Sequence, residues 1–155
     1  FSPKPDYLVQ ADKFGYSTTY SGQNLVSIGL RATKTLIEKC EGTGYAAKFG
    51  LGCVQWTGAR TKNLIEYYIA LYGIDTKLNK EMCYRAETKF MIQELTSDTY
   101  NHIYEEWNTN YKGSSKAAYE AGRLICLKYE VPADREAASK KRGDMAQKIY
   151  DIFMS

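Results

Sequence analysis

The chain has little of several features that mark common classes of protein. No apolar run approaches the roughly 20 residues that a helix needs to cross a membrane. The opening residues 1–5 have neither the charge nor the apolar core of a signal peptide. The single histidine, His102, has no local sequence support as part of a Ser-His-Asp or Cys-His hydrolase. The sequence therefore predicts a soluble protein without a membrane span.

Motifs of several catalytic and metal-binding classes are also missing. Phosphate loops, dinucleotide fingerprints and the HExxH zinc motif are absent, and residues 50–52 lack the third glycine of GxGxxG. Cys40, Cys53, Cys83 and Cys126 form no CxxC pair, which argues against a zinc knuckle or a thioredoxin-type site. We predict no cofactor and no metal ion. We expect the cysteines to be buried as small hydrophobic residues instead of forming a disulfide framework.

The charges are mixed along the chain. Lys and Arg are interspersed with Asp and Glu, the formal net charge is +3, and no basic tract indicates a nucleic-acid partner. Hydrophobic residues make up 44% and charged residues 25%, which fits a globular chain with one core. Tyrosine is abundant, with 14 copies. Tyrosines can line a groove for sugars or peptides, and half-buried packing is the alternative.

Residue periodicity predicts a mainly α protein. Prolines, glycines and the polar run 16–20 predict extended segments or a β-hairpin over residues 1–24. Apolar side chains at three- and four-residue spacing then predict a series of helices. These helices span residues 25–40, 63–72, 80–95, 99–107, 116–129 and 134–153. Three of them have a predicted apolar stripe: Leu30, Thr33, Leu36, Ile37 and Cys40 in the first helix, Tyr84, Phe90, Met91 and Leu95 in the third, and Met145, Ile149, Ile152 and Phe153 in the last. Without an internal repeat or linker, we predict a single domain over residues 1–155, with Asp134 as the N-cap of the last helix.

The segment with the richest chemistry is GLGCVQWTGAR at residues 50–60. Its glycines let the backbone approach a ligand, Gln55 offers an amide for hydrogen bonds, and Trp56 offers a ring for stacking. A sugar cleft needs these groups. The alternative is a packed turn in which Trp56 fills the core and Gln55 caps a helix.

The pattern GxGxxQWT, followed by an arginine and a helix, resembles the core signature of phage tail lysozymes, in which this turn lines the glycan cleft. Residues 124–132 and 141–146 are similar to the closing region of that family, and residues 87–95 are similar to its middle helix. The resemblance covers residues 44–153. It implies a lysozyme-like domain.

This resemblance implies a peptidoglycan glycosidase located in the phage tail of the virion. Such an enzyme cuts the bond between N-acetylmuramic acid and N-acetylglucosamine, by hydrolysis or by lytic transglycosylation. The implied partners are glycan strands, other tail proteins or an upstream segment of the same precursor. The implied substrate-binding residues are Gly52, Gln55, Trp56, Tyr45 and Glu130.

The family is described as using one glutamate at a helix end, usually followed by serine, as the acid that protonates the glycosidic oxygen. A small residue and Phe-x-Pro usually follow, and this chain opens with Phe1-Ser2-Pro3. The resemblance therefore places the family acid a few residues before residue 1. Within the chain, Glu41 at the end of the helix 25–40 is the candidate acid, although only 14 positions separate it from Gln55.

Other interpretations of these residues stay open. Glu38 fits a solvated side chain or a partner of lysine, and Glu130 fits a structural acid bonded to backbone amides or to Arg142. The chain could also be an inactive virion structural protein or glycan-binding protein that keeps the fold. A cysteine peptidase using Cys53 and His102 is a third hypothesis.

Overall fold

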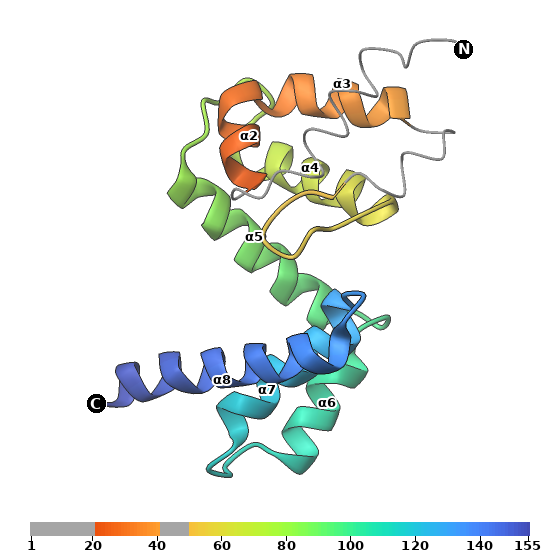
Figure 1. Cartoon of the computed structure of the whole chain (residues 1–155). Helices are drawn as coiled ribbons and strands as arrows, with labels where there is room; N and C mark the ends of the chain where they lie inside the picture. The colour runs from red at the N-terminus through yellow and green to blue at the C-terminus, as the bar shows by residue number, and fades with distance from the viewer. Residues whose placement is uncertain (1–20, 41–49) are drawn as a thin grey trace. The chain divides into compact units, whose positions relative to one another are not determined.

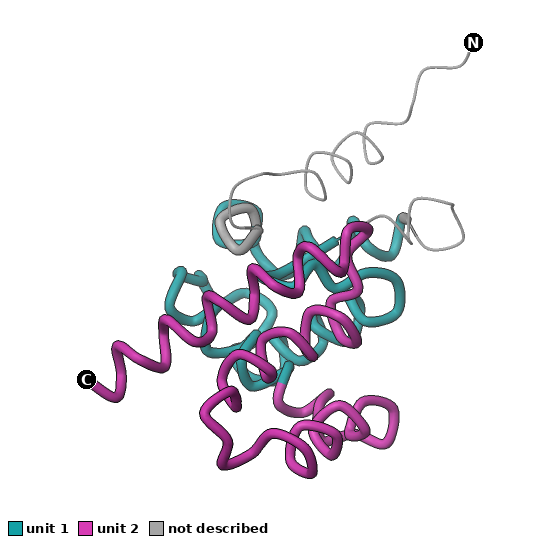
Figure 2. Tube along the Cα trace, turned by 60° about the horizontal axis from the view of Figure 1, so that its bottom comes forward, with its two compact units in different colours: residues 1–91 teal, residues 92–155 magenta. Residues whose placement is uncertain are grey.

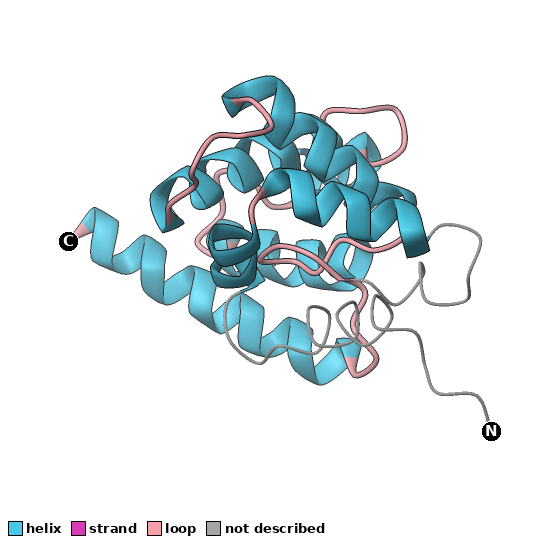
Figure 3. Cartoon of the chain, turned by 90° about the horizontal axis from the view of Figure 1, so that it is seen from above, coloured by secondary structure: helices cyan, strands magenta, loops and turns pink. Residues whose placement is uncertain are grey.

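The computed structural model of this chain describes residues 21–40 and 50–155. Most of the predicted extended or hairpin segment lies outside the described residues, as do Glu41 and Tyr45. The described part is built from helices joined by loops (Figure 3), which confirms the mainly α fold class. Its only β pairing is an isolated antiparallel bridge between Leu51 and Trp56.

The chain divides into two compact units at the residue pair Met91 and Ile92, as the two colours of Figure 2 show. Each unit has its own helices and is described by itself. The single-domain arrangement over residues 1–155 stays a prediction.

The first unit contains α2 (Ser21–Ile28), α3 (Leu30–Cys40), α4 (Ala59–Tyr72) and most of α5 (Lys80–Leu95) (Figure 1). The prediction of one helix over residues 25–40 is wrong, because Gly29 separates two helices. Its φ of +89° lies in the left-handed region, which glycine adopts without steric penalty. The first helix also begins earlier than predicted, at Ser21.

Helix α3 buries the face that periodicity predicts. Leu30, Thr33, Leu36 and Ile37 are all buried, and the Thr33 hydroxyl donates to the Gly29 carbonyl oxygen at 2.7 Å. Among the described residues of the first unit, the buried apolar side chains are Leu25, Leu30, Leu36, Ile37, Leu51, Trp56, Leu64, Ile65, Tyr68, Leu78, Cys83, Ala86 and Phe90.

Helix α5 has the predicted bounds, and Phe90 of its predicted stripe is buried, but the rest of its buried face differs. The predicted stripe includes Tyr84, which is 45% exposed. The buried face of α5 runs through Cys83, Ala86, Glu87 and Phe90. The prediction missed this face because a carboxylate at a core position interrupts the apolar pattern.

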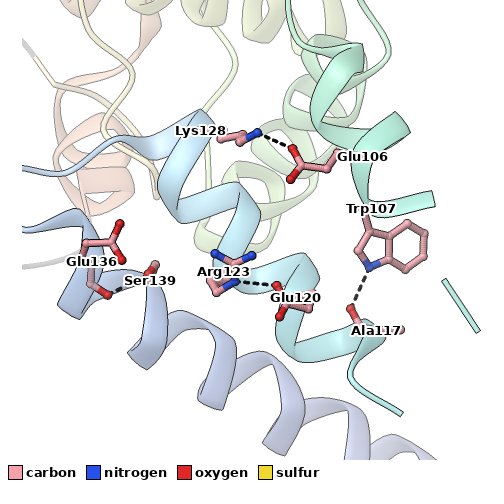
Figure 4. A network of polar contacts seen from close by, with 8 residues as sticks. All are labelled: Glu106, Trp107, Ala117, Glu120, Arg123, Lys128, Glu136 and Ser139. Carbon is pink, nitrogen blue, oxygen red and sulfur yellow. Dashed lines mark hydrogen bonds and ion pairs between the residues drawn. The ribbon is translucent and has the colours of Figure 1, made fainter. Parts of the chain in front are cut away.

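The second unit contains the end of α5, then α6 (Asn101–Asn110), α7 (Ala117–Ile125), a π-helical segment (Cys126–Glu130) and α8 (Arg135–Met154). Polar contacts join α6 to α7 and to the π-helical segment (Figure 4). The Trp107 indole N–H donates to the Ala117 carbonyl oxygen at 2.8 Å, and Lys128 pairs with Glu106. The predicted helix 116–129 is α-helical only as far as Ile125 and continues as the π-helical segment. At the end of this segment the Val131 N–H donates to the carbonyl oxygen of Cys126, five residues earlier, at 2.9 Å.

Helix α8 packs through small residues instead of through the predicted apolar stripe. The stripe residues are Met145, Ile149, Ile152 and Phe153, and all four are exposed. The buried positions are Ser139 and Gly143, and a Cβ on Gly143 would lie 2.6 Å from the Tyr119 ring. Close backbone approach leaves no apolar signature in a sequence. Asp134 stands at the predicted N-cap but makes no side-chain cap hydrogen bond.

The described cysteines do not share one environment. Cys83 and Cys126 are buried, as predicted, whereas the prediction is wrong for Cys53, which is exposed on a turn. All three are free thiols. Among the residues described, no helix is long and apolar enough to span a membrane.

Candidate functional site

Residues 51–56 form a tight turn that leads into α4. The Leu51 N–H donates to the Trp56 carbonyl oxygen at 3.0 Å, and the Trp56 N–H donates to the Leu51 carbonyl oxygen at 2.8 Å. Gly52 and Gln55 both have positive φ, of +81° and +55°. A left-handed conformation costs a residue other than glycine about 1–2 kcal/mol. Strain of this kind at an exposed glutamine is typical of functional turns.

Gly52 is required both by space and by its positive φ, and Gly50 leaves room for the Gln55 carboxamide. A Cβ on Gly50 would lie 2.6 Å from the Gln55 Oε1 atom. A Cβ on Gly52 would lie 2.6 Å from ring carbons of Trp56 and 3.2 Å from the Glu87 carboxyl carbon. The glycines therefore admit these three side chains close to the backbone of the turn.

Trp56 lies in the core beneath the turn. Its side chain is 1% exposed, and its ring packs edge-on against Phe90 with centroids 5.4 Å apart. Its carbonyl oxygen accepts a hydrogen bond from the buried Thr61 hydroxyl. The packed-turn alternative describes this position, and direct contact between Trp56 and a sugar stays a prediction.

Gln55 is the exposed polar side chain of the turn. Its Nε2 group donates to the Gly52 carbonyl oxygen at 3.0 Å, while the Gln55 backbone N–H donates to the same oxygen at 3.1 Å. The carboxamide is therefore held in one orientation at the surface. A fixed amide can hydrogen-bond the hydroxyl and acetamido groups of a sugar.

Glu87 is the site residue that the sequence analysis missed. Its side chain is 1% exposed, and Oε2 accepts the Cys53 backbone N–H at 2.8 Å. Oε1 accepts the Tyr68 hydroxyl at 2.8 Å. Burial, followed by the charge of Glu87, raises the pKa of the Tyr68 hydroxyl above its ordinary value, so the hydroxyl stays protonated and donates the hydrogen bond. The signal was available, since Glu87 lies three or four positions from Cys83 and Phe90 on one helix face.

The remaining predicted residues have other surroundings. Glu130 ends the π-helical segment of the second unit, and its carboxylate accepts a hydrogen bond from Arg142 Nε at 3.4 Å. The structure therefore shows the pairing of Glu130 with Arg142 that the structural interpretation predicts. Glu38 lies 4.0 Å from Lys34 and is half exposed, as its solvated interpretation predicts.

The two residues of the cysteine peptidase hypothesis lie in different units. Cys53 belongs to the first unit and His102 to the second, and both are exposed. Over residues 21–40 and 50–155, no group of three or more His, Cys, Asp or Glu residues could hold a metal ion.

The fold and the turn define a helical protein with a strained Gln-Trp turn buttressed by a buried carboxylate. The family model of the phage tail lysozyme matches residues 20–153, a range that includes the turn, Glu87 and Glu130. The chain belongs to the phage tail lysozyme family, as its sequence motifs predict. No curated protein and no solved structure matches it.

Proposed function

We propose that the protein is a peptidoglycan glycosidase of a phage tail. It cuts the β-1,4 bond between N-acetylmuramic acid and N-acetylglucosamine during host entry. The observation that carries this proposal is the exposed Gln55 carboxamide, fixed by a strained turn in a chain of the phage tail lysozyme family. Location in the virion and contact with other tail proteins, or with an upstream segment of the same precursor, belong to the same proposal.

The turn binds the glycan, and a carboxyl group supplies the acid. Gln55 hydrogen-bonds the sugar, while Gly52 and Trp56 shape the turn that presents it. Tyr45 and Glu130 are proposed further contacts. The acid transfers its proton to the glycosidic oxygen, and the bond from that oxygen to the anomeric carbon breaks. Glu41 is the proposed acid among the residues of this chain.

The reaction can end in two ways. Attack of water on the anomeric carbon gives a reducing end, whereas attack of the sugar's own 6-hydroxyl gives an anhydro sugar and no water is consumed. The proton of the attacking hydroxyl passes to a base in either case. The two products differ in mass by one water molecule.

The test is digestion of purified cell walls followed by mass spectrometry of the products. The experiment compares the chain with a form extended at its N-terminus, and each form is also made as Glu41→Gln. If the unextended chain cleaves and its Glu41→Gln variant does not, Glu41 is supported as the acid. If only the extended form cleaves, and Glu41→Gln does not abolish that cleavage, the acid lies in the added residues. Binding to walls without products from any form would contradict a glycosidase and favour a glycan-binding virion protein.

A further inference from the structure

The buried carboxylate of Glu87 connects three parts of the first unit. Glu87 extends from α5 and accepts the backbone N–H of Cys53 in the turn and the hydroxyl of Tyr68 on α4, each at 2.8 Å. Cys53 stands two positions before Gln55 in the turn. One side chain therefore fixes the turn to two helices.

An acidic side chain at this position needs a reason other than packing. Its neighbours on the buried face of α5 are Cys83, Ala86 and Phe90, which need no polar partner. Burying a carboxylate is costly unless hydrogen bonds compensate for lost hydration. Here those bonds come from the turn and from Tyr68, so the carboxylate is matched to the backbone of the turn.

We infer that Glu87 is a positioning residue for the glycan-binding turn. Its carboxylate holds the backbone at Cys53. This contact maintains the left-handed conformation of Gln55, two residues later, which orients the Gln55 carboxamide. This inference rests on the proposed function. Glu87 itself does not touch the glycan, because Gly52 and the turn cover its carboxyl group.

The hydrogen bonds show which substitution keeps the link. In Glu87→Gln, the carboxamide oxygen still accepts the Cys53 N–H, and the NH2 group donates to the Tyr68 oxygen. The Tyr68 hydroxyl can then give its proton to the Cys83 carbonyl oxygen, which lies 3.3 Å away. Glu87→Met is similar in length and offers no strong acceptor, so the Cys53 N–H loses its partner.

The test compares E87Q and E87M for cleavage of soluble, uncross-linked peptidoglycan strands. We expect E87Q to keep the wild-type KM. We expect E87M to raise KM by about tenfold to hundredfold with a smaller change in kcat, because the turn binds the glycan before and during reaction. Unchanged KM in folded E87M overturns the inference, as does a tenfold rise in folded E87Q.

Glu94→Met is the matched control on the same helix. Glu94 accepts the Tyr129 hydroxyl at 2.5 Å, so this variant also removes a carboxylate bonded to a tyrosine. We expect it to lower Tm without raising KM. An equal rise of KM in E94M and E87M overturns the inference, because general destabilisation would then explain both.

Amide hydrogen exchange provides a readout that needs no substrate. The Cys53 amide should be protected in the wild type and E87Q and should exchange faster in E87M. Equal protection in all three overturns the inference. A wild-type protein that neither cleaves nor binds peptidoglycan contradicts the proposed function instead, whatever the behaviour of the Cys53 amide.

Discussion

Gly52→Ala is the perturbation whose cost follows most directly from the structure. The new Cβ would meet the Trp56 ring at 2.6 Å and the Glu87 carboxyl carbon at 3.2 Å. The φ of +81° adds strain of about 1–2 kcal/mol for an alanine. Overpacking against a buried ring adds about 1–3 kcal/mol. The free energy of unfolding should therefore fall by roughly 2–5 kcal/mol in total.

Gly29→Ala is the matched control for this prediction. Gly29 has a similar φ of +89°, and nothing lies within 4 Å of its Cβ position, so only the strain should appear. Urea unfolding followed by circular dichroism measures both variants. Equal losses of stability in G52A and G29A would refute the close packing of Trp56 and Glu87 around the turn.

Three further predictions concern other parts of the structure. Trp56→Ala should lower the free energy of unfolding by roughly 3–5 kcal/mol in urea denaturation, since the ring is buried, and a loss below about 1 kcal/mol would contradict its core position. Arg142→Ala should cost under about 1 kcal/mol by the same method, because the arginine of the Glu130 pair is largely exposed. Burial raises the pKa of the Cys83 thiol, so the folded state favours the neutral form. Stability measured against pH should fall above the ordinary thiol pKa of about 8.5, and a Cys83→Ala variant should show a smaller fall.

The sequence predicted the helical fold where apolar periodicity was strong. Helix α3 buries the predicted face, and α5 has the predicted bounds although Glu87 interrupts its apolar pattern. Prediction failed where contacts leave no apolar pattern. The positive φ of Gly29 ends α2 and divides one predicted helix into two. Helix α8 packs through Gly143, while its predicted apolar stripe is exposed.

The candidate site was predicted in part. The turn at residues 50–56 was found from its residue types together with the resemblance of GxGxxQWT to the phage tail lysozyme signature. The role of Trp56 as a buried support depends on Phe90, which lies 34 positions away in the chain. The helix spacing places Glu87 on the face of Cys83 and Phe90, but its role could not be predicted, because its hydrogen-bond partners at Cys53 and Tyr68 come together only in the folded chain.

The most direct test of the proposed function is the rate at which Gln55→Ala releases fragments from purified peptidoglycan. Gln93→Ala makes the same change at an exposed position of α5 and serves as the control. If the turn holds the glycan, Q55A should bind and cleave peptidoglycan at least about tenfold more weakly than wild type, while Q93A stays unchanged. Equal binding and cleavage by wild type, Q55A and Q93A would contradict the assignment of the turn as the glycan-binding site.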